Sequence, residues 1–372
     1  MTLIVDGTTG VTFNDSSLQG AAASPFGLKN RIINGDMVVS QRNGTSSVSI
    51  DNTEKFVVDR FLIRSNASGL SATSQQSTIV PNNFVNSMIV SVTTGGTIAA
   101  ATRGYIQQRI EGFNVADLGW GAAGASTVTL SFWVRSSKTG TFSGALQNDP
   151  SLANRSYVFT YSISSANTWE QKSITIIGDT TGTWYKNNLP SINVMFDLGN
   201  GSDLRTAPTG SWVTGDFRGA NSSVNIFDTS GATFYFTGVQ LERNTTATPF
   251  EWLPYTTELQ LCQRYALMIK NGTTSIDRFG LGSTVNSTTV QLLIQHPVQM
   301  RAAPTLTTTG TAGDYQVYST AVTTCSAAPT LGEGSQFNSR YNFVTAGGLT
   351  GGQVSQCSGA NTNAYLLLSA EI

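Results

Sequence analysis

The chain contains one histidine, and hydrolase triads and many metal sites depend on histidine. His296 lies in the segment QHPVQM, directly before a proline at the end of an expected strand. A Ser-His-Asp triad would also need a nucleophile on a sharp turn, and the sequence has no GxSxG elbow. A histidine-rich zinc site would need further histidines. We therefore expect His296 to be structural or exposed.

Paired carboxylates are a second route to catalysis, because glycoside hydrolysis requires only two Asp or Glu side chains that face one glycosidic bond. The sequence offers several such acids, although no spacing pairs them: Asp51, Glu54, Asp59, Glu111, Glu170, Asp197 and Asp203. We predict that the chain has no catalytic residue, with a polysaccharide depolymerase as the alternative.

The segment DLGNGSD at Asp197–Asp203 places several oxygen ligands close together, as calcium loops do. It lacks the full EF-hand pattern, and an ordinary β-turn uses the same residue types. The sequence therefore leaves a calcium ion at this loop open. We predict no cofactor and no metal site.

Sugar binding usually combines an exposed aromatic ring, which stacks on the ligand, with polar groups that fix its orientation. Trp120, Trp184 and Trp212 lie in turns rich in Gly or Thr. Trp184 and Trp212 are therefore candidates for receptor contacts. The alternative is that these rings are partly buried packing residues.

Composition favours strands over helices in this chain of 372 residues. Only 12% of the residues are charged, whereas an average soluble domain is about 25% charged. Helices usually carry Lys, Glu and Arg on their solvent face, while strands can present Thr, Ser and Asn there. With 37 glycines and 39% hydrophobic residues, the composition indicates an extended β protein with many turns.

Charge and hydropathy exclude several classes of function. The chain has 21 Lys and Arg against 22 Asp and Glu, so its net charge of −1 does not suit a nucleic-acid partner. No apolar run reaches the ~18 residues of a membrane-spanning helix, so we expect no membrane insertion. The opening MTLIVDGTTGVTF lacks a charged n-region and a long apolar core, so we expect synthesis in a cytoplasm without a signal peptide.

The three cysteines, Cys262, Cys325 and Cys357, form no CxxC pair. We expect buried free thiols, which is the common state of cysteines that are not part of a framework. A disulfide between Cys325 and Cys357 stays open, because connectivity cannot be read from sequence.

Turn signals and one helical segment divide the chain into four parts, 1–28, 29–255, 256–272 and 273–372. Short strands separated by turns fill the second part, which predicts a β-sandwich or barrel. The strand from Ser126 shows the pattern most clearly, because apolar side chains fall on one face: Val128, Leu130, Phe132 and Val134. The fourth part returns to strands, and we expect a smaller C-terminal β-sandwich.

The first part contains a turn signal, DGTTG, between short apolar stretches. These stretches predict a strand, a turn and a second strand. A piece of this size cannot bury its apolar side chains alone, so we expect a partner to complete it. The side chains concerned are Leu3, Val5, Val11 and Phe13.

The segment TTELQLCQRYALMIK predicts a helix over 256–270, with Thr256 or Thr257 as the cap. Its apolar face consists of Leu259, Cys262 and Tyr265. That face could meet symmetry mates in an oligomer, or it could pack on its own domain. Both alternatives stay open at this point.

Seven segments of the chain match one known family in order, over about 30–307: NRIINGDMVVSQRNG at Asn30–Gly44, VDRF at Val58–Phe61, QRIEG at Gln108–Gly112, VTLSFWVRSSKTGTF at Val128–Phe142, NTWEQKSITIIGDTTGTW at Asn167–Trp184, FYFTGVQLERNTTATPFEWLPYTTELQLCQRY at Phe234–Tyr265 and PVQMRAAPTLT at Pro297–Thr307. Together they resemble the tail-fibre and receptor-binding proteins of tailed bacteriophages, including cyanophages. The opening GTTGVTFNDSSLQ is also similar to the N-terminal piece of many phage fibres, although Asn14 stands where those have Pro and Ser16 where they have Gly.

The resemblance implies a homotrimeric fibre whose N-terminus attaches to the phage tail or baseplate. It implies a central jelly-roll β-sandwich like a carbohydrate-binding module, and a C-terminal tip that faces the host. The attachment residues would be Leu3, Val5, Val11 and Phe13, and the receptor contacts at the tip would be Tyr315, Tyr318, Arg340 and Tyr341.

We therefore expect an all-β virion protein that binds a host surface polysaccharide during adsorption. A virion-associated depolymerase is the first alternative. A purely structural decoration or baseplate connector protein is the second.

Overall fold

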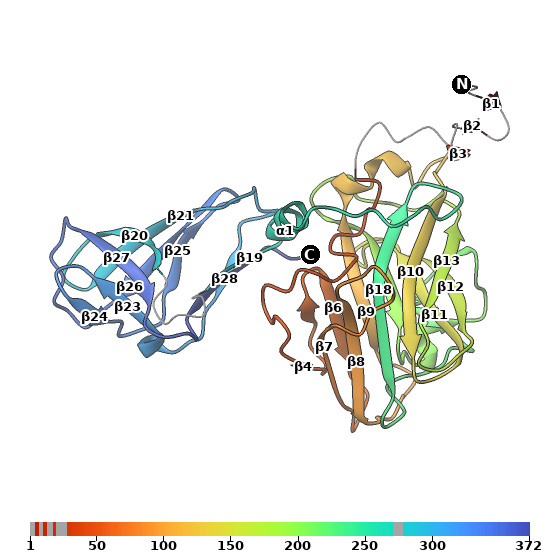
Figure 1. Cartoon of the computed structure of the whole chain (residues 1–372), viewed down its shortest axis with the longest axis horizontal. Coiled ribbons are helices and arrows are strands. Elements are labelled where there is room, and N and C mark those ends of the chain that lie inside the picture. The colour runs from red at the N-terminus through yellow and green to blue at the C-terminus, as the bar shows by residue number, and fades with distance from the viewer. Residues whose placement is uncertain (1–3, 7–9, 13–17, 20–27, 271–277) are drawn as a thin grey trace.

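Two antiparallel sheets pack face to face in the larger part of the chain, which we call the sandwich body (residues 28–254). The structure is a computed structural model that describes residues 4–6, 10–12, 18–19, 28–270 and 278–372. Within these residues, one sheet has six strands in the order β13-β10-β18-β8-β7-β4. The other has seven strands in the order β16-β12-β11-β14-β9-β6-β5. Figure 1 shows this body on the right of the molecule.

The chain passes repeatedly from one sheet to the other, which is the strand arrangement of a double-sheet β-sandwich. The strands of this body are β4 Val48–Ser49, β5 Lys55–Val58, β6 Phe61–Ser65, β7 Ser71–Ser77, β8 Ser87–Thr94, β9 Gly104–Glu111, β10 Val128–Ser136, β11 Gly140–Gln147, β12 Arg155–Ile163, β13 Glu170–Ile176, β14 Pro190–Asp197, β15 Arg205–Thr206, β16 Trp212–Thr214, β17 Gly219–Ala220 and β18 Thr233–Glu242. Short 3-10 helices are η1 Gly112–Asn114, η2 Ala116–Leu118 and η3 Ser202–Leu204.

The core between these sheets follows the alternation of the sequence. The apolar side chains of β10 are fully buried between the sheets, as the pattern predicted: Val128, Leu130, Phe132 and Val134. β10 pairs with β13 on one side and with β18 on the other, so it is a central strand. Each side chain points to the opposite face from its neighbour, which explains why one apolar set can fill the interior.

A second, smaller body (residues 264–372) has its own core and two further sheets. In the described residues, one sheet has three strands in the order β19-β28-β22, and the other has seven in the order β24-β23-β27-β20-β21-β26-β25. We call it the C-terminal body; it lies on the left of Figure 1. Its elements are β19 Ala266–Lys270, β20 Arg278–Thr284, β21 Thr289–Gln295, β22 Thr305–Thr307, η4 Ala312–Asp314, β23 Tyr315–Tyr318, β24 Val322–Thr324, β25 Thr330–Gly334, β26 Asn338–Val344, β27 Val354–Gly359 and β28 Tyr365–Ser369.

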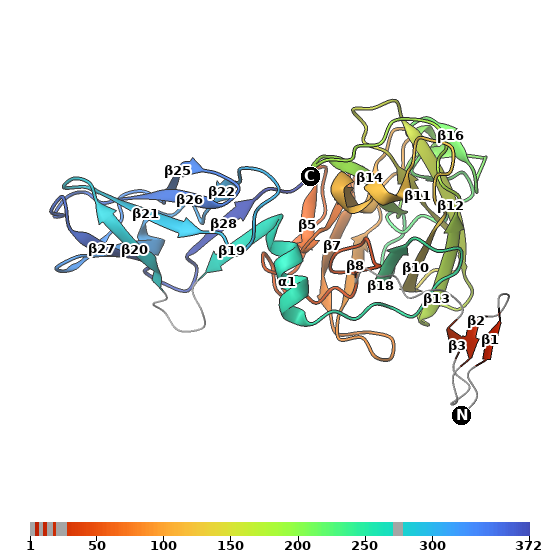
Figure 2. The same ribbon diagram turned by 90° about the horizontal axis from the view of Figure 1, so that it is seen from above.

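The helix is shorter than the sequence predicted. α1 spans Tyr255–Gln263, and the prediction of a helix over 256–270, in a linking part over 256–272, is wrong from Ala266 onward, where the chain forms β19. β19 pairs along its length with β28, so long-range sheet hydrogen bonds override the local helix propensity. Figure 2 shows α1 between the two bodies.

The start and the packing of α1 also differ in part from expectation. Pro254 occupies the cap position and no side chain caps the helix there, so neither Thr256 nor Thr257 has that role. The apolar face packs on this chain itself, because Cys262 and Tyr265 are fully buried against residues of the sandwich body, and Leu259 packs against the same cluster. The face therefore has no room for symmetry mates.

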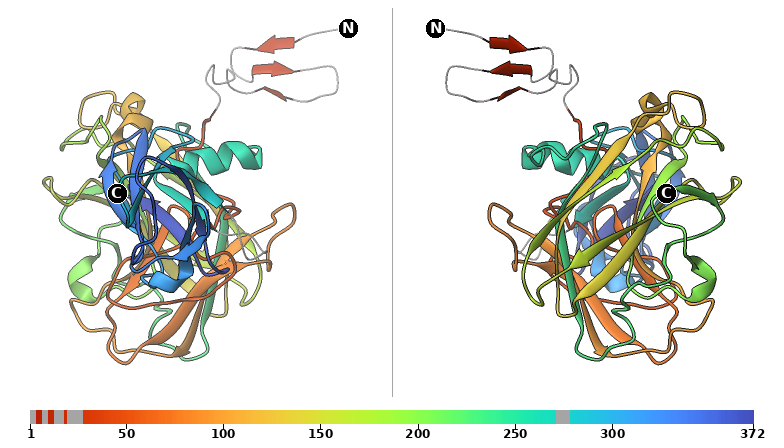
Figure 3. Two further views of the ribbon diagram at one scale, coloured as in Figure 1. Left: turned by 90° about the vertical axis from the view of Figure 1, so that its left-hand side faces the viewer. Right: turned by 90° about the vertical axis from the view of Figure 1, so that its right-hand side faces the viewer.

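The N-terminal part contains three short strands, β1 Ile4–Asp6, β2 Gly10–Thr12 and β3 Leu18–Gln19, which form one antiparallel sheet. Figure 3 shows this sheet outside the sandwich body. Val5 pairs with Val11 across the predicted turn. Leu3 and Phe13 lie outside the described residues, and their role as attachment residues stays a prediction.

The fold class is confirmed as nearly all-β, with a large antiparallel sandwich, one α-helix in the described residues, and a smaller C-terminal sandwich. No helix in the described part of the chain is both long and apolar enough to cross a membrane.

Candidate functional site

One face of the seven-stranded sheet in the C-terminal body is open to solvent and carries large side chains in line. Backbone pairing places Tyr318 of β23 opposite Val322 on one side and Gln356 on the other. Gln356 in turn lies opposite Leu281 of β20. Residues that pair directly point to the same face of a sheet, so these four side chains form the first half of a row.

The row continues beyond Leu281 to the other edge of the sheet. Gly282 pairs with Leu292, which places Leu281 beside Leu293 of β21. Leu293 pairs with Arg340 of β26, and Arg340 lies opposite Glu333 of β25. We call the complete line the cross-strand row: Val322, Tyr318, Gln356, Leu281, Leu293, Arg340 and Glu333.

The apolar part of the cross-strand row is exposed. Its large side chains are about half exposed or more: Leu281 68%, Val322 59%, Leu293 56% and Tyr318 49%. Val354 is 69% exposed on the same face, because it pairs with Ser283, two residues beyond Leu281. Apolar area of this kind gains about 25 cal/mol per Å² on burial, and contiguous patches on a protein surface usually mark interaction sites.

The other end of the row is polar and its side chains are held in place. The guanidinium of Arg340 donates to Glu333 Oε1 at 2.9 Å and to Gln291 Oε1 at 3.4 Å. The amide of Gln291 donates to Asn342 Oδ1 at 3.3 Å. The face thus combines an exposed aromatic ring and aliphatic side chains with an ordered set of hydrogen-bonding groups.

The structure separates the four residues predicted as tip contacts into two pairs. Tyr318 and Arg340 lie on the cross-strand row. Tyr315 and Tyr341 are fully buried in the core of the C-terminal body, so their prediction as surface contacts is wrong. The reason is strand alternation: Tyr315 shares its face with Val317, and Tyr341 shares its face with Phe343. The Tyr315 hydroxyl donates to the Tyr365 carbonyl at 2.8 Å, inside the body.

Sequence reasoning missed the leucines of the row. Leu292 and Leu293 are neighbours in the run VQLLIQ, and alternation alone cannot tell which of the two faces solvent. Leu281 lies between two glycines and carries no pattern at all. Their exposure follows only from the register with β26 and β27.

The three tryptophans predicted in turns pack against one another in the sandwich body. The ring centroids of Trp120 and Trp184 are 4.8 Å apart, and each lies 5.3 Å from that of Trp212, all edge to face. Their indole N–H groups donate to backbone carbonyls of Ser126, Thr181 and Ile177, respectively. Trp184 is buried and Trp212 only partly exposed, so this cluster has the character of packing rather than of an open stacking platform.

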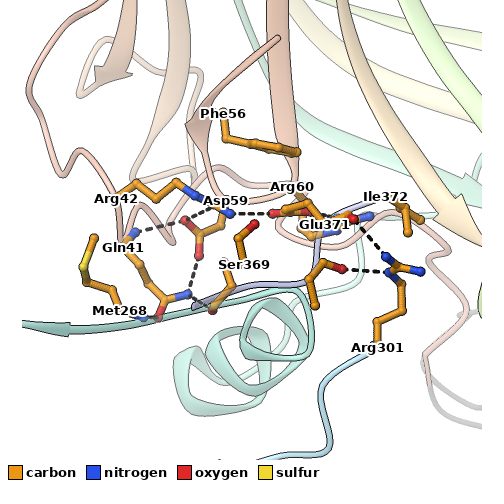
Figure 4. Close-up of polar contacts among 12 residues, drawn as sticks. Gln41, Arg42, Phe56, Asp59, Arg60, Met268, Arg301, Ser369, Glu371 and Ile372 are labelled. Atoms are coloured by element: carbon orange, nitrogen blue, oxygen red, sulfur yellow. Dashed lines mark hydrogen bonds and ion pairs between the residues drawn. The ribbon is translucent and has the colours of Figure 1, made fainter. Parts of the chain in front are cut away.

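Side chains from five of the seven segments quoted above meet at the joint between the two bodies. Figure 4 shows Arg60, from VDRF, beside Glu371 at the chain end. Arg60 forms an ion pair with Glu371 and donates to the Arg109 carbonyl. Arg42 also binds Glu371, at 3.0 Å. On the next strands, Glu111, from QRIEG, is fully buried.

Glu111 binds the segment LCQRY through two side chains. It accepts from Arg264 at 2.5 Å and from the Tyr265 hydroxyl at 2.7 Å. Arg301, from PVQMRAAPTLT, donates to the Ala370 carbonyl at 2.7 Å. Removing one partner of a buried ion pair usually costs about 3–5 kcal/mol, so this network fixes how the C-terminal body is attached.

Two acids in this joint have raised pKa values. Burial raises the pKa of Asp59 to about 6, although Arg42 and Gln41 oppose the shift. Burial also raises the pKa of Glu258 to about 7, with Asp36 and Glu251 adding to the shift. The pKa values of both acids in the folded chain therefore lie close to neutral pH.

Most of the residues considered for catalysis form hydrogen bonds or ion pairs with other residues of the chain. The His296 ring contacts the Gln336 carbonyl at 3.1 Å and the Ser339 hydroxyl at 3.0 Å, which is a structural arrangement. Six of the seven candidate acids form ion pairs with a basic side chain, namely Asp51, Glu54, Asp59, Glu111, Glu170 and Asp197.

The turn at Asp197–Asp203 is organised by protein donors. Asp197 accepts from the backbone N–H groups of Gly199 and Asn200 and from the guanidinium of Arg205. In the described residues, no three His, Cys, Asp or Glu side chains gather closely enough to hold a metal ion. Cys262, Cys325 and Cys357 are buried free thiols, as expected, and burial raises the pKa of the latter two to about 12.

No protein-family model matches the chain, and no curated protein matches it. Several solved structures match at low similarity. The enzymatically active domain of bacteriophage CBA120 tailspike protein 4 has 14% identity and a TM-score of 0.32, and the match covers 60% of this chain and 22% of that one. The family 11 carbohydrate-binding module from Clostridium thermocellum, in complex with a β-1,3-1,4-mixed-linked tetrasaccharide, has 14% identity and a TM-score of 0.28, covering 53% and 95%. The CBM22-1-GH10 modules of C. thermocellum xylanase 10B, complexed with xylohexaose, have 15% identity and a TM-score of 0.28, covering 50% and 26%. The match therefore spans less than a quarter of that tailspike domain, and these values assign the chain to no family.

Proposed function

We propose that this chain is a virion protein of the tail-fibre type, which binds a host cell-surface polysaccharide through the cross-strand row and acts without hydrolysing it. The observation that carries the proposal is the placement of Tyr318 and Arg340 on one exposed row of the C-terminal sheet. The order of the matching sequence segments supports the tail-fibre class.

The chemistry of the row suits a sugar chain. The half-exposed Tyr318 ring can stack on the apolar face of a sugar, while Gln356 and Arg340 supply hydrogen bonds. Tyr318 and Arg340 are separated by four strand spacings of about 4.8 Å, or roughly 19 Å in all. A single sugar cannot reach both residues, so the row fits several consecutive units of a polysaccharide.

Assembly would raise a weak affinity of this open face. We propose a homotrimer attached through its N-terminal part to a tail or baseplate protein. Three rows that engage one host surface act at a high effective concentration, so overall avidity exceeds the affinity of one row by a factor of about 10²–10⁴.

The proposal of binding without hydrolysis is supported by the state of the candidate acids. Glu111 and Asp197 are fully buried and paired with arginines, which removes them from any bound chain. Glycosidases need two acids at about 5–10 Å on either side of one bond. The cross-strand row itself contains a single acid, Glu333.

A competition experiment tests the proposal. The purified chain is added to host cells before phage, and free phage is counted after adsorption. We expect the wild-type chain to inhibit adsorption, and Tyr318→Ala and Arg340→Ala to inhibit about tenfold less well, because each removes ~1–2 kcal/mol of contact. Phe113→Ala is the matched control, since Phe113 is 61% exposed but lies in the sandwich body.

The outcomes separate the alternatives. Absence of inhibition at saturating protein would favour a purely structural decoration or connector protein. New reducing ends after incubation with host polysaccharide would show a depolymerase. Equal inhibition by wild type and both row variants would place the receptor site elsewhere on the chain.

A further inference from the structure

A hollow of about 430 Å³ opens on the surface of the sandwich body. Pockets that bind small ligands usually measure about 300–1,000 Å³. One wall is the loop between β8 and β9, with Ile98 and Ala100. The other walls are η3, with Ser202, and the segment that carries Asn221 and Asn225. None of these residues belongs to the cross-strand row.

Arg205 also lines this hollow, and its side chain is fixed by three contacts. The guanidinium donates through Nε to Asp197 Oδ2 at 2.9 Å, through Nη1 to the Ser223 carbonyl at 3.3 Å and through Nη2 to Asn225 Oδ1 at 2.5 Å. A guanidinium has about five N–H groups in a planar fork. These three contacts within the described residues leave two N–H groups for a ligand.

A buried carboxylate behind Arg205 sets the charge of the hollow. Asp197 is fully buried and accepts from two backbone N–H groups, at 3.0 Å and 2.8 Å, and from the Asn200 amide at 3.1 Å. Burial raises the pKa of Asp197, while its ion pair with Arg205 at 2.9 Å and the backbone N–H groups oppose that shift. Because the two charges cancel, the hollow presents hydrogen-bonding groups without a net charge.

We propose that this hollow binds a neutral sugar residue, as a second carbohydrate site on the chain. In this proposal the two remaining N–H groups of Arg205 donate to hydroxyls of the sugar ring. Asn221 and Ser202 add an exposed amide and an exposed hydroxyl. Ile98 and Ala100 face the apolar C–H groups of the ring. A preorganised donor set of this kind binds with little ordering of its own side chains.

The second site goes beyond the proposed function, because it lies on the other body and does not depend on the cross-strand row. If both sites bind the same polysaccharide, each subunit contacts it through the sandwich body as well as through the cross-strand row. A sugar chain engaged at two sites on one subunit gains further effective concentration.

Saturation-transfer difference NMR on the full chain tests this inference. The probes are five neutral sugars, glucose, galactose, mannose, rhamnose and N-acetylglucosamine, together with glucuronate. We expect saturation transfer to at least one neutral sugar. Ser202→Trp and Ala100→Trp fill the hollow from opposite walls, and each should reduce the transfer at least fivefold.

Two controls keep the result interpretable. Ser222→Trp adds the same ring at an exposed position beside the hollow and should leave the transfer unchanged. The filling variants are also made in a Tyr318→Ala background, which removes transfer through the cross-strand row, and they should reduce the remaining transfer at least fivefold there as well. Near-UV circular dichroism shows that each variant is folded.

Three results would overturn the inference. They are transfer to none of the neutral sugars, transfer to glucuronate alone, and undiminished transfer in whichever filling variant is folded. Failure of the adsorption experiment would leave these NMR results intact, so the two proposals fail separately.

Discussion

The guanidinium of Arg60 lies over the ring of Tyr265, with its Cζ atom 3.6 Å from the ring centroid. Arg60 belongs to the turn between β5 and β6, whereas Tyr265 lies two residues after the end of α1, so this cation–π contact joins the two bodies. Arg60 also has a φ angle of 72°. That left-handed conformation costs about 1–2 kcal/mol in a residue other than glycine. The contacts with Tyr265 and Glu371 hold it there.

Replacing Arg60 by methionine tests how much this joint contributes to the stability of the chain. Arg60→Met keeps a long side chain but leaves Tyr265 without its cation and Glu371 with Arg42 alone. Since the guanidinium is almost fully buried, we expect a loss of about 3–5 kcal/mol. The measurement is the thermal midpoint by calorimetry, together with the rate of limited proteolysis between the bodies.

Arg64→Met is the matched control. Arg64 lies on β6, four residues after Arg60, but its guanidinium donates to the exposed side chain of Asn52. We expect a change of no more than about 0.5 kcal/mol, as for most surface substitutions. A similar midpoint for both variants would show that Arg60 does not hold the joint.

The joint also shows what the sequence could and could not provide. The segments VDRF, QRIEG and LCQRY are conspicuous in the sequence, and the structure brings Arg60, Glu111 and Tyr265 together. Their separation along the chain hides this contact, because only the register of β6 with β9 places Arg60 near Glu111. These three segments therefore contribute side chains to the joint between the two bodies.

The raised pKa of Glu258 predicts the direction in which the stability of the chain changes with pH. Its folded pKa of about 7 lies above the ordinary value of 4.5, because the side chain is buried near Asp36 and Glu251. The folded chain therefore binds more protons than the unfolded chain between these values. The stabilisation from this group is fully present below pH 4.5 and is lost as the pH rises through about 7.

Glu258→Gln should remove the contribution of this group to the pH dependence of the free energy of unfolding. The Gln side chain retains an oxygen that accepts from the Asn34 N–H, and it cannot ionise. We expect the variant to be more stable than wild type above pH 7, and its urea midpoint to vary less between pH 4.5 and 7. Glu333→Gln, at a side chain 76% exposed, is the control. Parallel curves for wild type and Glu258→Gln would contradict the prediction.

Replacing Trp184 tests whether the tryptophan cluster stabilises the fold or contacts the receptor. Its ring contacts both Trp120 and Trp212, so Trp184→Ala should create a cavity and lower stability by about 3–5 kcal/mol. Trp252→Ala should cost less, because that ring is 50% exposed. Urea unfolding measures both. If Trp184→Ala kept its stability but lost inhibition of adsorption, Trp184 would be a receptor contact after all.

Alternation explains why two of the four predicted tip residues lie on the outer face of the sheet and two are buried. In DYQVYST, Tyr315 and Val317 share one face and Tyr318 takes the other, so the sequence already contained the signal that separates the two tyrosines. In SRYNF, Arg340 likewise alternates with Tyr341. The exposed leucines had no such signal. Their side chains face solvent because the inner face of the sheet is already filled by residues such as Leu292 and Phe343.

The aliphatic part of the cross-strand row allows one decisive test, because leucine and valine suit a protein partner as well as a sugar. We expect light scattering to give three times the mass of one chain. Leu281→Asp places a charge at the centre of the row, where the side chain is 68% exposed and the fold tolerates it. If the row binds polysaccharide, the variant keeps the trimer mass and inhibits adsorption about tenfold less well, a loss of ~1.4 kcal/mol. If its mass falls to that of one chain, the row is the contact between subunits, and the receptor site must lie on another face.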